Sequence, residues 1–499
     1  MSSTKSSRKH IAKASSDNAA ISFDHLSSLT YMAALADGNP SRDILLRLTI
    51  SQNYQTGVYF RQVYLLAKRM GFEYTRAFRM VAKKAGASIV KTHLLRFAGA
   101  ITAGVSEAEF LAQEARVERE QYINNYYRSL EALAKWGDAY AALLVSISLV
   151  VVVAMISTML NDLGDMFVIA LTGATFFVSF FGVYIIHRTA PHEDKNYQNR
   201  RGPKLRRLAK RSFYVFTLPG AVLGISFGWF FGFPYFLLTM GVALLPSGVL
   251  AWLENGKLNS LDQEAATFIR SLGNVTASLS TTLSAALLKI DRRALGALDP
   301  YIKRLQILLD RKITPEKAWD AFRDEVGSQL MSRSTRMFVD GVALGGAPDR
   351  IGEIASAYAM DTALMRDRRV VTAAPFAFLI IPLHFAMTGL TVFVMEIMIA
   401  FNDRISAAAA QLAAQSGSSG LSIAQSLPVF RGQDLTLMGN LTMATLLSMT
   451  ISNALAPKVA LGGHPLNAAL FGAITCLMTG FNMLIIPPIA SGILLTGSA

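Results

Sequence analysis

Two ionisable side chains, His384 and Glu396, lie inside a long apolar run between Val371 and Phe401. Ionisable groups are costly within a membrane span, so they commonly mark a substrate or proton path. The structural alternatives are a neutral histidine bonded to a neighbouring helix and a glutamate that reaches water at the end of its span. Secondary transport through a site around His384 and Glu396 is therefore one hypothesis for the function.

The sequence contains no recognised signature of a catalytic site. It lacks a glycine-rich phosphate loop, a His-Glu-x-x-His zinc motif, a Gly-x-Ser-x-Gly nucleophile turn and a cysteine pair. Its one cysteine, Cys476, lies in an apolar run and is expected to be a packing residue. These observations argue against an ATPase or a metalloprotease, and we expect no enzymatic activity, no cofactor and no metal.

Apolar runs long enough to cross a bilayer organise most of the chain. Of its 499 residues 52% are hydrophobic and 16% are charged, and a membrane helix needs about 20 apolar residues. We predict an all-α polytopic membrane protein with about seven transmembrane helices. Two lie in 137–187 (137–160 and 164–187), two in 212–254 (212–231 and 233–254), one at 371–401 and two in 434–499 (435–455 and 466–494).

The placement of basic residues predicts the orientation of these spans. The segment 188–211 is a basic loop that contains Lys204, Arg206, Arg207, Lys210 and Arg211, and such loops stay in the cytoplasm. This rule explains the net charge of +14 without nucleic acid as a partner. It predicts a multi-pass protein of the plasma membrane with a cytoplasmic N-terminus and an external C-terminus. Residues 402–433 are then an external loop, and residues 1–42 a flexible cytoplasmic tail.

Two polar segments with helical periodicity, 43–136 and 255–370, are predicted to be cytoplasmic helical-bundle domains. Ser106 followed by Glu109 is a capping box, and Thr314 followed by Pro315 is a typical helix start. The two segments match each other when the chain is shifted by 208 positions. The shift pairs Phe60 with Phe268, Leu94 with Ile302, Arg96 with Arg304, and Phe97 with Leu305. We therefore expect a repeated domain.

The order of these domains and two stretches of sequence resemble a known family. The stretches are Leu309-Asp310-Arg311-Lys312-Ile313-Thr314-Pro315-Glu316-Lys317-Ala318-Trp319 and Asn453-Ala454-Leu455-Ala456-Pro457-Lys458 with Gly462-Gly463. Over about residues 55–495 the chain resembles the type II secretion F-domain superfamily, the platform proteins of secretion systems, type IV pili and archaella. Bacterial members usually have three spans, so the larger expected layout is similar to the archaeal branch, the platforms of the archaellum and of archaeal type IV pili.

The resemblance implies a non-enzymatic membrane platform that couples ATP-driven motion to the insertion of filament subunits or to filament rotation. The implied partners are a cytoplasmic hexameric ATPase, pilin-like or archaellin subunits and membrane lipid. A homodimer of this chain would suit a platform beneath the hexameric ATPase. The ATPase-docking candidates are Arg304, Asp310, Arg311, Lys312, Glu316 and Arg323, with the basic residues of 188–211 as a second contact. Attraction to anionic lipid is the alternative for that basic segment. A membrane receptor or scaffold is a third reading, and archaellum and adhesive pilus both stay open.

Overall fold

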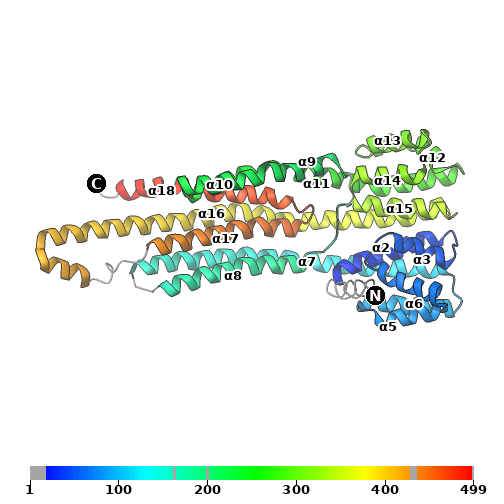
Figure 1. The fold of residues 1–499 in the computed structure, drawn as a ribbon, viewed down its shortest axis with the longest axis horizontal. Coiled ribbons are helices and arrows are strands. Elements are labelled where there is room, and N and C mark those ends of the chain that lie inside the picture. Colours follow the sequence, from blue (N-terminus) through cyan, green and yellow to red (C-terminus); the bar gives the residue numbers. More distant parts are fainter. Residues whose placement is uncertain (1–17, 161–164, 198–201, 427–434, 497–499) are drawn as a thin grey trace. The chain divides into compact units, whose positions relative to one another are not determined.

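Helices account for nearly all of the part of the chain that the structure describes. The structure is a computed structural model, and it describes residues 18–160, 165–197, 202–426 and 435–496 (Figure 1). Apart from one isolated β-bridge, these residues contain no strand, which confirms the all-α prediction. Within them, six stretches of helix are long and apolar enough to cross a membrane. They belong to α7 (Glu107–Leu160), α8 (Asp165–Thr189), α9 (Lys204–Ser212) with α10 (Leu218–Phe231), α11 (Phe233–Ser278), α16 (Pro348–Ser426) and α18 (Asn467–Thr496).

The seventh expected span, 435–455, forms α17 (Leu435–Leu461), which is not among those six helices. α17 packs against α8 and α18, and it buries polar side chains such as Thr445, Thr450 and Asn453. A helix surrounded by other helices can carry such groups because they bond to its neighbours instead of facing lipid. The count of seven spans therefore stays a prediction.

Contacts divide the chain into two compact units, each built from three segments. Unit 1 comprises the described residues within Met1–Ser129, Pro191–Pro203 and Asn255–Arg368. Unit 2 comprises those within Leu130–Ala190, Lys204–Glu254 and Arg369–Ala499. Most of both expected helical domains thus lies in unit 1, whereas the apolar parts of the long helices lie in unit 2.

The prediction of a flexible tail over 1–42 is wrong for the region of α2 (Asn18–Ala36). Tyr31 and Leu35 of this helix are fully buried, and α2 packs against α15 (Gln329–Ala343). Hydroxyl groups of this segment bond to its own backbone: those of Ser27 and Thr30 each donate to the carbonyl four residues earlier. Such bonds allow a helix rich in Ser and Thr to enter a core. Residues 1–17 lie outside the described residues.

In unit 1, the helices of the two segments that match by sequence occur in the same order. The first set is α4 (Gly57–Met70), α5 (Tyr74–Lys84), α6 (Ser88–Thr102) and the start of α7, preceded by α3 (Arg42–Ser51). The second set is the end of α11, then α12 (Leu283–Lys289), α13 (Asp299–Asp310) and α14 (Pro315–Val326). After the shift of 208 positions, α4 and α11 end at equivalent residues, α6 and α13 also end together, and α7 and α14 begin together.

Turn geometry and burial follow the same shift. The turn before the last helix of each set has a residue with positive φ at the equivalent position, Gly104 at 72° and Lys312 at 57°. Phe97 and its equivalent Leu305 are both buried, as are Phe60 and Phe268. α14 begins at Pro315 as predicted, although the hydroxyl of Thr314 makes no capping hydrogen bond.

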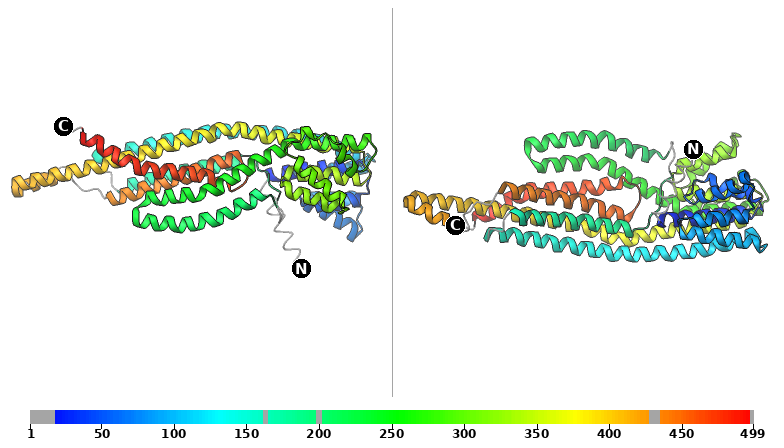
Figure 2. Two further views of the ribbon diagram at one scale, coloured as in Figure 1. Left: turned by 90° about the horizontal axis from the view of Figure 1, so that it is seen from above. Right: turned by 60° about the horizontal axis from the view of Figure 1, so that its bottom comes forward.

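In unit 2, α10 and the first part of α11 form an antiparallel hairpin, drawn in green in Figure 2. The hairpin turns at Gly232, whose φ of 103° favours glycine. Small residues let its two helices approach closely: a Cβ built at Gly220 would lie only 2.2 Å from the Cβ of Ala243. A short π-helical segment, Phe213–Thr217, joins α9 to α10.

The prediction of an external loop over 402–433 is wrong in its secondary structure, because α16 continues as a helix to Ser426. The run of alanines from 407 to 410 favours helix, and the first proline after this run is Pro428. Residues 427–434 lie outside the described residues, and the external location of the segment stays a prediction.

Candidate functional site

Five of the six docking candidates of the second predicted domain share one exposed surface in unit 1. Asp310, Arg311, Lys312 and Glu316 lie in and beside the turn between α13 and α14, and all of residues 310–317 are exposed. Arg304 lies earlier on α13, and its Nη1 donates to Glu325 Oε1 on α14 at 2.7 Å. We call these five residues the α13–α14 surface. Charges of both signs lie together there, on two helices that pack against each other.

The sixth candidate, Arg323, is wrong as a docking residue. It is only 6% exposed, and its Nη2 donates to Asp320 Oδ1 at 2.5 Å. The helical spacing explains this burial, because Trp319, Phe322 and Val326 are buried on the same side of α14. Its guanidinium is buried within unit 1.

The basic candidates on α9 also divide into two classes. Lys204, Arg207, Lys210 and Arg211 are exposed. Arg206 is 6% exposed, and its Nε donates to Glu254 Oε1 on α11 at 2.6 Å. The prediction that Arg206 contacts a partner at the surface is therefore wrong. Arg206 forms an internal ion pair with Glu254 that holds α9 against α11 within unit 2.

His384 lies at the centre of a buried polar network in unit 2. Asn453 Nδ2 donates to His384 Nδ1 at 3.1 Å, while Asn453 Oδ1 accepts from the Tyr140 hydroxyl at 3.0 Å. The other ring nitrogen, Nε2, then carries the hydrogen, and it is 2.9 Å from the Thr479 hydroxyl and 3.2 Å from the Thr475 carbonyl. Both ring nitrogens are thus engaged as in a neutral imidazole, and the network joins α7, α16, α17 and α18.

Glu396 does not join this network. It lies on α16 twelve residues after His384, about 18 Å further along at roughly 1.5 Å per residue. Its side chain is partly exposed. The structure therefore does not bring the two expected members of a transport site together, and it gives His384 the bonding pattern of a helix-packing residue.

We expect the His384→Leu variant to be less stable by about 1–2 kcal/mol, because Asn453 and Thr479 lose an interhelical hydrogen bond. The midpoint of thermal unfolding of the purified protein in detergent measures this loss. Glu396→Gln is the matched control and should leave the midpoint unchanged. Proton flux into proteoliposomes that disappears in the leucine variant, with an unchanged midpoint, would instead support a transport site.

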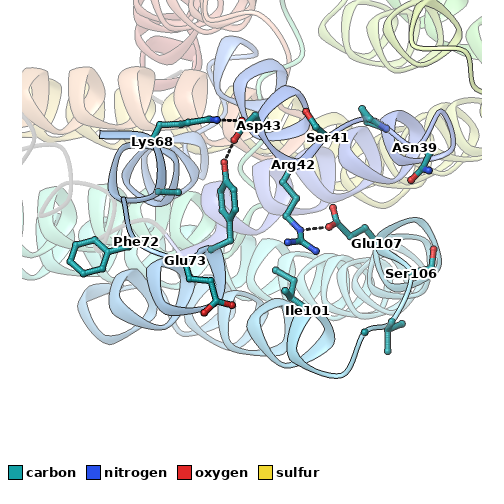
Figure 3. A pocket seen from close by; sticks show the side chains of 15 residues that line it. Asn39, Ser41, Arg42, Asp43, Lys68, Phe72, Glu73, Ile101, Ser106 and Glu107 are labelled. Atoms are coloured by element: carbon teal, nitrogen blue, oxygen red, sulfur yellow. Dashed lines mark hydrogen bonds and ion pairs between the residues drawn. The ribbon is translucent and has the colours of Figure 1, made fainter. Parts of the chain in front are cut away.

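Sequence reasoning missed a pocket of about 670 Å³ in unit 1. It lies between the ends of α3, α4, α6 and α7, and Figure 3 shows how its charged side chains pair across it. Arg42 pairs with Glu107, and Asp43 accepts from both Lys68 and Tyr74. These two donors hold the pKa of the Asp43 carboxyl below its usual value. Arg42, Asp43, Lys68 and Glu107 are therefore engaged in ion pairs across the pocket.

Sequence reasoning also missed a buried ion-pair cluster around Arg366. Its Nη1 donates to Asp262 Oδ2 at 2.7 Å, and its Nε donates to Glu193 Oε2 at 3.2 Å. Glu193 belongs to the expected basic loop, and two residues later the backbone of Lys195 accepts from Gln329 at the start of α15. Residues 191–197 of that segment are therefore built into unit 1. Nothing in the spacing of residues 193, 262 and 366 could have revealed this cluster.

Comparison with known proteins gives one informative similarity. No family model matches the chain, and no solved structure matches it. The chain is 24% identical over 303 residues to flagella accessory protein J of Methanococcus voltae. The match covers 57% of this chain and 53% of that protein, so the chain spans about half the length of the relative. The fold and this match together make the chain a helical protein with membrane-spanning character that is similar to flagella accessory protein J.

Proposed function

We propose that this chain is the non-enzymatic membrane platform of an archaellum or related pilus machine. The observation that carries the proposal is the similarity to flagella accessory protein J. Two further features support it: six apolar helices, and a separate unit whose helices present charged surfaces. The equivalent helix ends at the shift of 208 positions support a duplicated domain, the arrangement of type II secretion platforms.

In this proposal unit 1 is cytoplasmic, the chain acts as a homodimer, and a hexameric ATPase docks on the α13–α14 surface. That surface is exposed and charged, which suits a complementary patch on a soluble partner. Pilin-like or archaellin subunits pack against the apolar helices of unit 2. Movement imposed on unit 1 passes into unit 2 along α7, α11 and α16, because each of these helices contributes residues to both units.

The docking surface can be tested by reversing Arg311 and Lys312 together. We expect Arg311→Glu with Lys312→Asp to weaken co-purification of the cognate ATPase about tenfold, because like charges then face each other across the interface. Aspartate is chosen at 312 because it tolerates the positive φ of that residue. The matched control is Lys83→Glu with Lys84→Glu, an exposed basic pair at the end of α5.

Filament assembly tests the function as a whole. A host strain without this gene should lose its surface filaments, and the wild-type gene should restore them. The His384→Ala with Glu396→Gln variant, if it is stably produced, should restore them as well. Normal filaments in the strain without the gene would refute the platform proposal, and solute uptake that requires both residues would establish the transporter instead.

A further inference from the structure

One end of unit 2 gathers basic side chains from several elements. Arg206 of α9 pairs with Glu254 of α11. Arg369 of α16 donates to the Val459 and Ala460 carbonyls at the end of α17, at 2.9 and 3.0 Å. Its guanidinium fits closely over Gly462, where a Cβ would lie 2.8 Å from Arg369 Cζ. Both guanidinium groups are buried.

His464, in the turn between α17 and α18, lies within the influence of several of these basic side chains. Burial is the main cause that lowers the pKa of His464 to about 4, and nearby Arg206, Lys210 and Lys458 lower it further. Burial and Arg369 lower the pKa of the Lys458 ammonium as well. Within this cluster, Arg206 pairs with the Glu254 carboxylate.

The exposed side of α9 extends this basic cluster to the surface. Lys204, Arg207 and Arg211 recur at helical spacing and are exposed, as is Lys210. Exposed apolar side chains lie beside these cations in sequence: Leu208 is 50% exposed, Tyr214 is 64% exposed and Val215 is 53% exposed. Cations beside exposed aromatic and aliphatic groups, directly before a span, form the pattern of a membrane–water interface.

We propose that the exposed side of α9, backed by Arg206, Lys458 and Arg369, binds the phosphate-bearing head groups of anionic membrane lipids. The neighbouring exposed side chains of Tyr214 and Val215 can contact the glycerol region and an acyl chain of a lipid. Inorganic phosphate and an acidic protein surface have no such groups, so these side chains favour lipid as the ligand. The pair of Arg206 with Glu254 fixes α9 in place, so the other cations face one direction.

Thermal unfolding of the full chain in neutral detergent tests this site. Added phosphatidylglycerol should raise the unfolding midpoint, whereas phosphatidylcholine or sodium phosphate at the same concentration should not. In the variant Arg207→Gln with Lys210→Gln and Arg211→Gln, the phosphatidylglycerol concentration for half the effect should rise at least about tenfold, since each surface cation contributes to lipid binding. The control replaces Lys83, Lys84 and Lys91 of unit 1 by Gln and should behave like the wild type.

A second variant, Arg207→Lys with Arg211→Lys, keeps the charge and should retain the response to phosphatidylglycerol. Equal stabilisation by phosphatidylcholine, or by sodium phosphate alone, would overturn the lipid assignment. So would an unchanged lipid response in the triple variant. Loss of ATPase co-purification in that variant, with a normal lipid response, would assign α9 to a protein partner instead.

Discussion

Replacing Arg366 by methionine is expected to destabilise unit 1 by about 3–5 kcal/mol, because removing one partner of a buried ion pair leaves its carboxylates uncompensated. The side chains of Glu193 and Asp262 are only 6% and 4% exposed, so neither carboxylate can reach water when the guanidinium is lost. Asp262 also accepts from the hydroxyl of Ser328, the residue that caps α15. The cluster thus joins the segment 191–197, α11, α15 and α16 within unit 1.

Hydrogen exchange of the full chain in detergent measures this effect, since amides of α15 and the end of α11 should lose protection. Arg368→Met is the matched control. Arg368 is exposed and lies over the ring of Tyr127 at 5.4 Å, a contact of about 0.5–1 kcal/mol. Adding Glu193→Gln and Asp262→Asn to Arg366→Met should recover most of the protection, because no buried charge then remains. Equal exchange in the two single variants would mean that the cluster contributes little.

The second large effect is expected where α11 and α18 cross in unit 2. A Cβ built at Gly248 would lie 2.5 Å from the backbone nitrogen of Leu470 and 2.6 Å from its Cα. Backbone atoms cannot move aside as a flexible side chain can, so Gly248→Ala must push the two helices apart. We expect a loss of about 2–3 kcal/mol, in the range typical of overpacked cores.

Gly173 on α8 provides a control of opposite sign. It is exposed, and a Cβ built there meets nothing within 4 Å among the described residues. Gly173→Ala should therefore stabilise α8 by up to about 1 kcal/mol through helix propensity alone. The unfolding midpoint of each variant in a titration with a denaturing detergent provides the comparison. Two shifts of the same sign and size would show that the close approach at Gly248 does not limit stability.

The sequence alone determined the features that depend on local composition. Long apolar runs predicted the six helices that are long and apolar enough to cross a membrane, Pro315 predicted the start of α14, and charged residues around a turn predicted the exposed α13–α14 surface. The helix ends and the two turns with positive φ in the structure agree with the shift of 208 positions. These properties follow from hydropathy, backbone preference and helical spacing over a few turns. Each depends on local sequence and not on contacts with distant residues.

Only the tertiary structure decided what each polar residue does. Arg206 and Arg323 look like their exposed neighbours in sequence, yet both are buried by the faces of α9 and α14 that pack inward. The Ser-rich segment 18–36 became the buried helix α2, and His384 became part of a hydrogen-bonded network instead of a pair with Glu396. Asn453 lies 69 residues from His384, and Glu193 lies 173 residues from Arg366. The free energy of a polar side chain depends on such distant partners, and a local pattern carries no information about them.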